Sequence, residues 1–252
     1  MIKKIKNNFK KPYLMPKKIF KKIKNYSLKK KYNISHFEKK QNDLFSELGF
    51  EREMGILKLQ ELKKNYKFLN REMSSEHEVI FSCLSSLTNK KINNILEIGT
   101  FDGVNSFLLS LLFKESNITT IDLKNNSEAF KNSYNRNMKL ENFLENRNKI
   151  LSKAPKINFK ELNSLNLINH KDKYDLIWID GAHGYPFVCI DIINSLKLIN
   201  EDGIIMCDDV YINKPETQDD IYYSLASFET LKELQNENII KLNLLYKRLD
   251  AD

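Results

Sequence analysis

Apolar positions in the larger part of the chain, from about residue 92 onward, fall into short runs separated by segments with helical periodicity. Alternation of this kind is typical of βαβ units, which build a mainly parallel sheet. The pattern predicts strands at residues 94–98, 118–122, 157–161, 175–180 and 203–208, with a last strand at 239–247. Helices are predicted at about 104–114, 127–140, 185–199 and 218–236, with a weaker one near 165–171. We therefore expect a doubly wound, mainly parallel sheet with helices on both faces.

The chain before this region shows helical spacing without the alternation of a strand. Ser74 or Ser75, followed by Glu78, predicts the capped start of a helix over about residues 76–88. Together these patterns divide the chain into three parts. They are a basic arm over residues 1–34, a helical lobe or lid over residues 35–90 and a Rossmann-like α/β domain over residues 91–252.

Composition is that of a folded protein with one sizeable core. The chain has 252 residues, of which 41% are apolar and 11% aromatic, so it needs no disulfide or structural metal to fold. No apolar run approaches the roughly 18 residues of a membrane-spanning helix. Three cysteines stand in apolar stretches, with no C-x-x-C and no Cys/His metal pattern, which favours a reducing compartment and hence the cytoplasm.

The net charge of +8 is concentrated in the arm. Residues 1–31 hold thirteen lysines and no acidic residue, so the rest of the chain is net acidic. The arm lacks the features of a secretory signal. A solvated tail is the favoured interpretation, and a short basic helix over residues 17–31 that contacts an anionic membrane is the alternative. Nucleic acid is not expected as a partner, because the acidic body offers no broad phosphate-binding face.

The first predicted strand runs into a glycine turn and then a helix. Gly99 and Gly103 allow the backbone to approach a ligand, although a tight βα turn alone would explain them equally well. The spacing is G-x-x-x-G, so the dinucleotide fingerprint G-x-G-x-x-G is missing. Asp122 ends the next strand, where a carboxylate can accept both hydroxyls of a ribose. The combination favours a cofactor that contains adenosine.

Glu97 lies inside the first strand, two residues before the glycine turn. A buried carboxylate is costly unless a cation or hydrogen-bond donors answer it. The ammonium and sulfonium groups of S-adenosylmethionine would do so, which separates this pattern from a nicotinamide site.

A second group of polar residues follows the fourth and fifth predicted strands. Asp180 ends an apolar strand, His183 comes three residues later, and Asp208 and Asp209 end the next strand. If the strands are neighbours, three acids meet at one edge of the sheet, and an all-oxygen set with open positions suits Mg²⁺, or else Mn²⁺ or Ca²⁺. The alternative is that Asp208 and Asp209 only cap a loop. Beside an activated hydroxyl, His183 would be a suitable general base.

The other histidines and one further acid are assigned no chemistry. His36, His77 and His170 lie outside this group, although His77 could face it from the lobe. Asp191, in the helix after His183, is expected to be a charge on the surface of that helix.

Three motifs give the sequence a family resemblance. They are E-I-G-T-x-x-G at Glu97–Gly103, I-D-G-x-H-x-Y at Ile179–Tyr185 and D-D at Asp208–Asp209. Through them the chain, over roughly residues 74–247, resembles the class I S-adenosylmethionine-dependent methyltransferases. More narrowly, it resembles the metal-dependent sugar O-methyltransferases of macrolide and aminocoumarin tailoring, together with the cephalosporin hydroxylase-like group.

The resemblance implies a role for each residue of the motifs. Asp180, Asp208 and Asp209 would hold Mg²⁺, and His183 would be the base, with Asp180 beside it in the catalytic site. Ser164 would lie near the adenine, although Asn163 stands before it where an acid is common. The implied cofactor-binding residues are Glu97, Gly99, Thr100, Phe101, Gly103, Asp122, Ser164 and Asp180.

The expected function is therefore transfer of a methyl group from S-adenosylmethionine to a hydroxyl of a diol. A sugar or other glycan is preferred to a catechol because the resemblance is to sugar enzymes. Two alternatives stay open: a nicotinamide-dependent oxidoreductase, and a non-catalytic adaptor that binds S-adenosylmethionine or nucleotide and docks through the basic arm. Whether the chain forms a homo-oligomer is also left open.

Overall fold

The structure is a computed structural model that describes residues 33–70, 75–133, 139–213 and 224–249. The chain divides into two units. The smaller unit contains helix α3 (Ile34–Glu47), which begins at Asn33, whose side chain accepts a hydrogen bond from the backbone N–H of His36. The larger unit, residues 50–247, contains the sheet and the candidate site. Almost all of the predicted basic arm lies outside the described residues.

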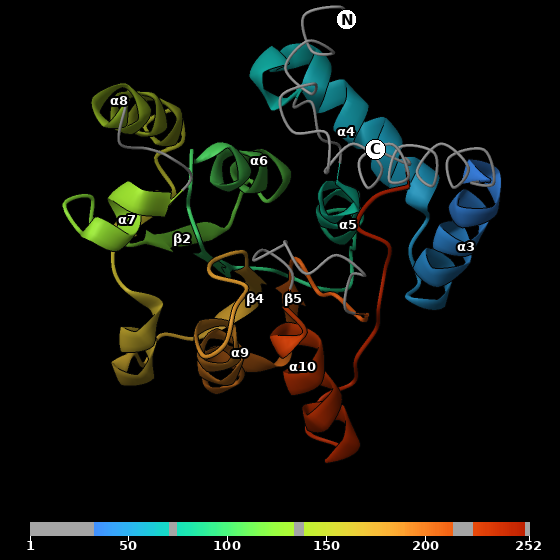
Figure 1. Cartoon of the computed structure of the whole chain (residues 1–252). Helices are drawn as coiled ribbons and strands as arrows, with labels where there is room; N and C mark the ends of the chain where they lie inside the picture. The colour runs from blue at the N-terminus through green and yellow to red at the C-terminus, as the bar shows by residue number, and fades with distance from the viewer. Residues whose placement is uncertain (1–32, 71–74, 134–138, 214–223, 250–252) are drawn as a thin grey trace, which may run out of the picture. The chain divides into compact units, whose positions relative to one another are not determined.

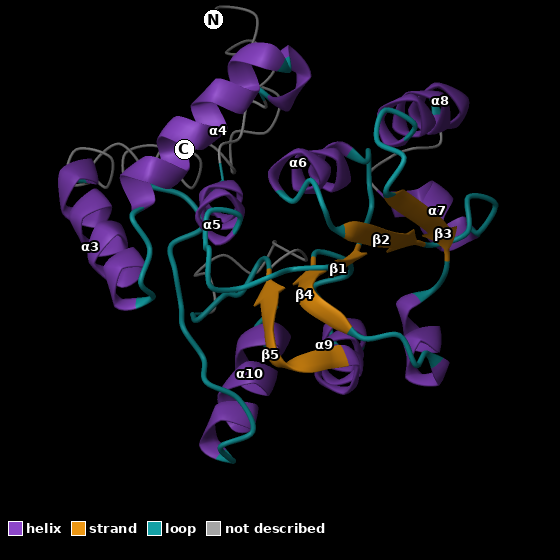
Figure 2. Ribbon diagram, turned by 180° about the vertical axis from the view of Figure 1, so that it is seen from behind, coloured by secondary structure: helices purple, strands orange, loops and turns teal. Residues whose placement is uncertain are grey.

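Five parallel strands form the sheet of the larger unit, which confirms the predicted fold class. They run in the spatial order β3-β2-β1-β4-β5 (Figure 2). The strands are β1 (Asn94–Ile98), β2 (Asn117–Asp122), β3 (Ile157–Glu161), β4 (Tyr174–Ile179) and β5 (Ile199–Cys207). The order reverses between β1 and β4, and ligands of open α/β sheets bind beyond the carboxyl ends of the strands at such a reversal.

Helices cover both faces of the sheet (Figure 1). One face carries α5 (Glu76–Leu84), α6 (Val104–Leu112) and α8 (Leu140–Leu151); the other carries α9 (Phe187–Leu198), α10 (Ala226–Asn236) and a 3₁₀ helix (Ser164–Asn169). Helix α4 (Arg52–Asn65), followed by a 3₁₀ turn (Lys67–Leu69), packs on α5. Because both faces are covered, β1 and β4 are almost entirely buried and apolar, as expected for central parallel strands.

The predicted strand at residues 239–247 is wrong, since that segment has no strand structure. Its alternating apolar pattern is only partly used in packing, because Ile240 and Leu242 lie against the core, whereas Leu244, which continues the same alternation, is exposed. The segment starts with the backbone N–H of Ile239 bonded to the carbonyl of Leu234. An extended segment can bury alternate side chains without pairing to a sheet.

The predicted helix at residues 127–140 is also wrong in extent. The structure has a short helix α7 (Glu128–Asn132) and a separate helix α8 (Leu140–Leu151), which the sequence pattern did not predict. Helix α8 has Arg147 at a position that faces the interior, where its guanidinium lies 4.3 Å from the centre of the Phe159 ring. Because a charged residue occupies this buried position, the helical periodicity of apolar residues could not be recognised in the sequence of α8.

Helix α5 begins one residue after Ser75, as predicted, but without the predicted capping box. The Glu78 carboxylate instead accepts a hydrogen bond of 2.6 Å from Lys63. The helix ends at Leu84, four residues before the predicted end. None of the described helices combines the length and the apolar character that a membrane-spanning helix requires.

Candidate active site

The turn after β1 lies directly against the end of β4. Gly99 has a φ of +104°, and a Cβ atom on it would lie 2.1 Å from the carbonyl oxygen of Asp180. A side chain is excluded there, so the ends of β1 and β4 can meet only if this residue is glycine. Gly103 has a φ of +77°, and its Cβ would meet the Leu151 side chain at 2.8 Å. The glycines are thus required by packing inside the protein, in addition to any approach of a ligand.

Glu97 is fully buried, and its carboxylate is hydrogen-bonded by neutral donors. Its carboxylate accepts hydrogen bonds from Asn105 (2.8 Å), Thr120 (2.6 Å) and the hydroxyl of Ser106. The Thr120 hydroxyl is also bonded to that of Thr100 at 2.7 Å. Burial raises the pKa of Glu97, against the opposing effect of these donors. The expected contact between Glu97 and a cation of the cofactor stays a prediction, since three donors from the chain already stabilise the carboxylate.

Asp122 lies at the end of β2 beside the glycine turn. Its Oδ2 accepts a hydrogen bond of 3.0 Å from the N–H of Phe101, and Oδ1 accepts one of 2.8 Å from the N–H of Leu123. Phe101 has a positive φ of 49° and a partly exposed side chain, whose ring packs 5.5 Å from that of Phe143. Each carboxylate oxygen can accept a further bond, so Asp122 fits a ribose diol placed over this turn.

Ser164 and Asp191 form a second polar pair, below the end of β4. The Ser164 hydroxyl bonds to the Asp191 carboxyl, and its carbonyl accepts from Asn194 at 3.2 Å. Asp191 is only 1% exposed, so the prediction that it is a surface charge is wrong. Burial raises its pKa to about 6. The predicted contact of Ser164 with the adenine stays a prediction.

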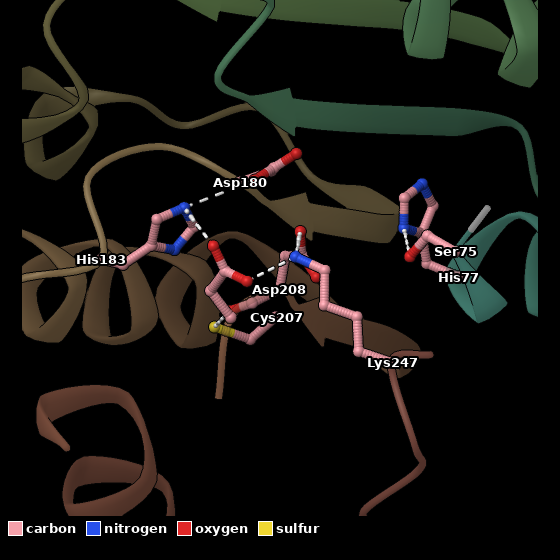
Figure 3. Close-up of polar contacts among 8 residues, drawn as sticks. Ser75, His77, Asp180, His183, Cys207, Asp208 and Lys247 are labelled. Carbon is pink, nitrogen blue, oxygen red and sulfur yellow. Dashed lines mark hydrogen bonds and ion pairs between the residues drawn. The ribbon is translucent and has the colours of Figure 1, made fainter. Parts of the chain in front are cut away.

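The three aspartates predicted to meet do so, and His183 lies among them (Figure 3). His183 Nε2 is 3.5 Å from Asp180 Oδ1 and 3.4 Å from Asp209 Oδ2. Asp209 has a positive φ of 48°, which turns the chain directly after β5. We call Asp180, Asp208 and Asp209 the acid cluster. The alternative that Asp208 and Asp209 serve only as loop caps does not account for these contacts.

Lys247 joins the acid cluster and was not predicted. Its ammonium donates to Asp208 Oδ2 at 2.6 Å and to Asp209 Oδ1 (Figure 3). It ends the segment that the sequence pattern had predicted to be a strand, and no motif surrounds it. The contact arises because the segment returns to α5, where the carbonyl of Lys247 accepts from the N–H of Glu76 at 2.9 Å.

His77, which had been left outside the group, also lies beside it. Its ring is stacked 4.8 Å from Trp178 of β4, and its Nδ1 is 2.7 Å from the Ser75 hydroxyl. His77 contributes to lowering the pKa of Asp208, so it is close enough to act on that carboxylate. The sequence left open that His77 faces the group from the lobe, and the packing of α5 over β4 decides that it does.

Comparison with known proteins shows which protein family this part of the chain matches. Residues 96–210, which include both strand-end motifs, match a family of methyltransferase domains. This region of the chain is a methyltransferase domain. A search of the curated proteins found no match.

The solved structures that resemble this chain include methyltransferases. The S-adenosylhomocysteine-bound methyltransferase PaMTH1 from Podospora anserina is 18% identical, with a TM-score of 0.45, over 66% of this chain and 70% of that one. The O-methyltransferase TomG from Streptomyces achromogenes, involved in tomaymycin synthesis and solved with S-adenosylmethionine, is 18% identical with a TM-score of 0.40. That match covers 58% of this chain and 61% of TomG, so it spans less than two thirds of that enzyme.

The charges of the methyltransferase site act on one another. Loss of hydration and the charge of Asp208 raise the pKa of Asp180, whereas Lys247 opposes that rise. Burial alone would raise the pKa of Asp208, but the charge and hydrogen bond of Lys247 outweigh it and the net pKa is lowered. Burial lowers the pKa of His183 despite the neighbouring acids, which favours the neutral imidazole at pH 7.

The acid cluster, as it is arranged, does not fit the predicted magnesium ion. An all-oxygen donor set suits Mg²⁺, but the Lys247 ammonium already binds both Asp208 and Asp209. Among the residues that the structure describes, no group of three or more His, Cys, Asp or Glu side chains could hold a metal ion. The magnesium prediction is therefore not supported at these residues.

Proposed function

We propose that the protein is an O-methyltransferase that methylates a hydroxyl of a diol-type acceptor, either a small molecule or a glycan. The observation that carries the proposal is the position of His183. Its Nε2 lies between Asp180 and Asp209 at the carboxyl ends of β4 and β5, next to the reversal of strand order where the glycine turn ends. This position supports a role for His183 as the base that deprotonates an acceptor.

The cofactor side of the proposal rests on the glycine turn and Asp122. Bound S-adenosylmethionine supplies a methyl group whose carbon–sulfur bond breaks as a bond to the acceptor oxygen forms. The turn at Gly99–Gly103 leaves room for the methionine part, and Asp122 offers carboxylate oxygens for the ribose. Glu97 stabilises the turn from below through Asn105 and Ser106 of α6.

On the acceptor side, the neutral imidazole of His183 takes the hydroxyl proton. Burial lowers the pKa of His183, so the imidazole is neutral and able to accept a proton near pH 7. The imidazolium that results faces Asp180 and Asp209, whose charges stabilise it. A closed, poorly hydrated site favours this reaction, because charge on the nucleophile and on the sulfonium disappears in the transition state.

The preference for a sugar rests on the resemblance in sequence and on the surroundings of His183. Tyr185 and Phe187 follow the base closely, and their side chains are exposed by 79% and 44%. An exposed aromatic face offers an apolar surface against which a sugar ring can pack. The acid cluster offers acceptors for the hydroxyls of the same ring.

Two measurements test the proposal. Calorimetry with S-adenosylhomocysteine and with NAD⁺ should show binding of the first alone, and binding of NAD⁺ alone would support the oxidoreductase alternative. Transfer of labelled methyl from S-adenosylmethionine should then be assayed with panels of nucleotide sugars, free glycans and catechols. Binding of S-adenosylhomocysteine without turnover on any panel would favour the non-catalytic adaptor.

The arm, the location and the assembly remain proposals that rest on the sequence. The lysines of residues 1–31 would contact anionic membrane lipids, and the three unpaired cysteines favour the cytoplasm. Binding to vesicles of phosphatidylserine and phosphatidylcholine, with and without residues 1–31, tests the first. Sedimentation of the full chain tests whether it forms a homo-oligomer.

A further inference from the structure

The carboxylates of the acid cluster alternate with two nitrogen groups, the imidazole of His183 and the ammonium of Lys247. Asp180 faces His183, His183 faces Asp209, and Asp209 faces Lys247, which also binds Asp208. Asp209 is shared, because its Oδ2 faces the imidazole while its Oδ1 accepts from the ammonium. Each carboxylate therefore has a nitrogen partner supplied by the chain itself.

The position of Lys247 is fixed by its backbone and by the residues around it. Its carbonyl accepts from the N–H of Glu76 at the start of α5, and the Glu76 carboxylate is held by two hydrogen bonds from Arg52, of 2.7 and 2.8 Å. Earlier in the same segment, Ile240 and Leu242 pack against the core of the sheet. The segment that carries Lys247 is therefore held at two places, at the core of the sheet and at the start of α5, and this positions the ammonium at the carboxyl ends of β4 and β5.

A lysine in this position does part of the work of a divalent ion. It neutralises the repulsion between neighbouring carboxylates, which is costly when they are taken out of water. It also orients Asp209, so that the free oxygen of that carboxylate faces His183 Nε2. A divalent ion bridging Asp208 and Asp209 would have to displace the ammonium from the oxygens that it now occupies.

We infer that Lys247 takes the place of a divalent cation in the acid cluster, so that the site works without a metal ion. The inference rests on the proposed function and names Lys247 as a positioning residue of that site. It carries a second consequence. Removal of the ammonium leaves Asp208 and Asp209 without their cation, and this pair of carboxylates is then open to a divalent ion.

Binding of Mn²⁺ to the full chain, followed by the loss of the free-ion electron paramagnetic resonance signal, tests the inference. The wild-type protein is expected to leave the signal unchanged, whereas Lys247→Met should bind one Mn²⁺ with an affinity at least about tenfold higher. Lys247→Arg retains the charge and should behave as wild type. Lys63→Met is the matched control, because it removes another partly buried lysine–carboxylate pair, with Glu78, away from the site.

Calorimetry with S-adenosylhomocysteine in the presence of EDTA completes the test. Unchanged cofactor binding by Lys247→Met shows that the variant is folded, and the Mn²⁺ measurement on the wild-type protein still tests the inference if the variant is not folded. Tight binding of Mn²⁺ by the wild-type protein, or no gain of Mn²⁺ affinity in a folded Lys247→Met, overturns the inference. Failure of the wild-type protein to bind S-adenosylhomocysteine would instead overturn the proposed function, whatever the Mn²⁺ result.

Discussion

The ammonium of Lys247 lies 2.6 Å from Oδ2 of Asp208, although the two residues are 39 positions apart in the chain. Asp208 directly follows the edge strand β5, and Lys247 lies at the end of the segment that follows α10. The pair gives the acid cluster a cation from within the chain. It also explains why the pKa of Asp208 is lowered although burial opposes that change.

Replacement of Gly99 by alanine should destabilise the protein on the order of 3 kcal/mol or more, because a methyl group would collide with the backbone of β4 at a positive φ. Gly184→Ala is the control, since a Cβ there meets no heavy atom within 4 Å. Its effect should stay within about 0.5 kcal/mol. Urea unfolding measures both, and equal stabilities of the two variants would contradict the close approach of β1 and β4.

Replacement of Glu97 should show that its role is to satisfy buried donors. Glu97→Leu leaves the donors of Asn105 and Thr120 without their acceptor, and should cost about 2–4 kcal/mol of unfolding free energy. Glu97→Gln keeps one acceptor oxygen, and the hydroxyls can turn to accept from its amide, so it should cost less. Denaturant unfolding checks the order, and a Glu97→Leu protein as stable as wild type would refute it.

Asp122→Asn should weaken binding of S-adenosylhomocysteine by about 10–100-fold, since a hydrogen bond to a charged carboxylate is worth about 1.5–3 kcal/mol. The amide oxygen can still accept from the N–H of Phe101, so the turn should remain intact. Exposed Asp172→Asn serves as the control. Calorimetry gives both affinities, and equal affinities would exclude Asp122 from the ribose site.

His183→Gln should lower the rate of methyl transfer by about 10²–10⁴-fold while the affinity for S-adenosylhomocysteine is retained, as expected for loss of a general base. The measurement is single-turnover transfer of labelled methyl to an acceptor found on the panels. His36→Gln, an exposed substitution in α3, should not change the rate. A His183→Gln enzyme with the full rate would require another base.

Asp191 should make stability fall as pH rises from about 4 to about 6. Burial raises its folded pKa to about 6 from an ordinary value of 3.8, so in this window the folded protein holds a proton that the unfolded chain has released. Each pKa unit corresponds to about 1.4 kcal/mol, which gives a loss of up to about 3 kcal/mol above pH 6. The neighbouring Cys207 thiol, with its pKa raised to about 12, does not titrate there.

The test compares Asp191→Asn with wild type by urea unfolding at pH 4.5 and pH 7. The variant carries no charge at either pH, so it should gain stability relative to wild type as the pH rises. Other groups titrate in both proteins and cancel in the difference. Parallel pH profiles would show that Asp191 is not the group responsible.

Much of the fold could be predicted from the periodic pattern of apolar residues within each segment of the chain. Strands β1 to β4 and helices α6 and α9 were predicted close to their observed limits, because buried parallel strands and amphipathic helices leave such patterns, whereas β5 begins four residues before its predicted start. Helix α8 was not predicted from the sequence, because the charged residue Arg147 occupies a buried position that an apolar residue would normally fill. The strand predicted at residues 239–247 failed because an extended segment that buries alternate residues gives the same alternation as a strand.

The sequence by itself placed Asp180, His183, Asp208 and Asp209 after the carboxyl ends of two strands, and parallel strands that are neighbours bring those ends to one edge. The tertiary structure made β4 and β5 neighbours. Only the tertiary structure decided which groups compensate the charges of these carboxylates. Lys247, His77 and the donors to Glu97 reach their partners through the packing of α5, α6 and the C-terminal segment, and no local spacing records such contacts. Periodicity is a property of neighbours along the chain, whereas charge compensation depends on distances in space.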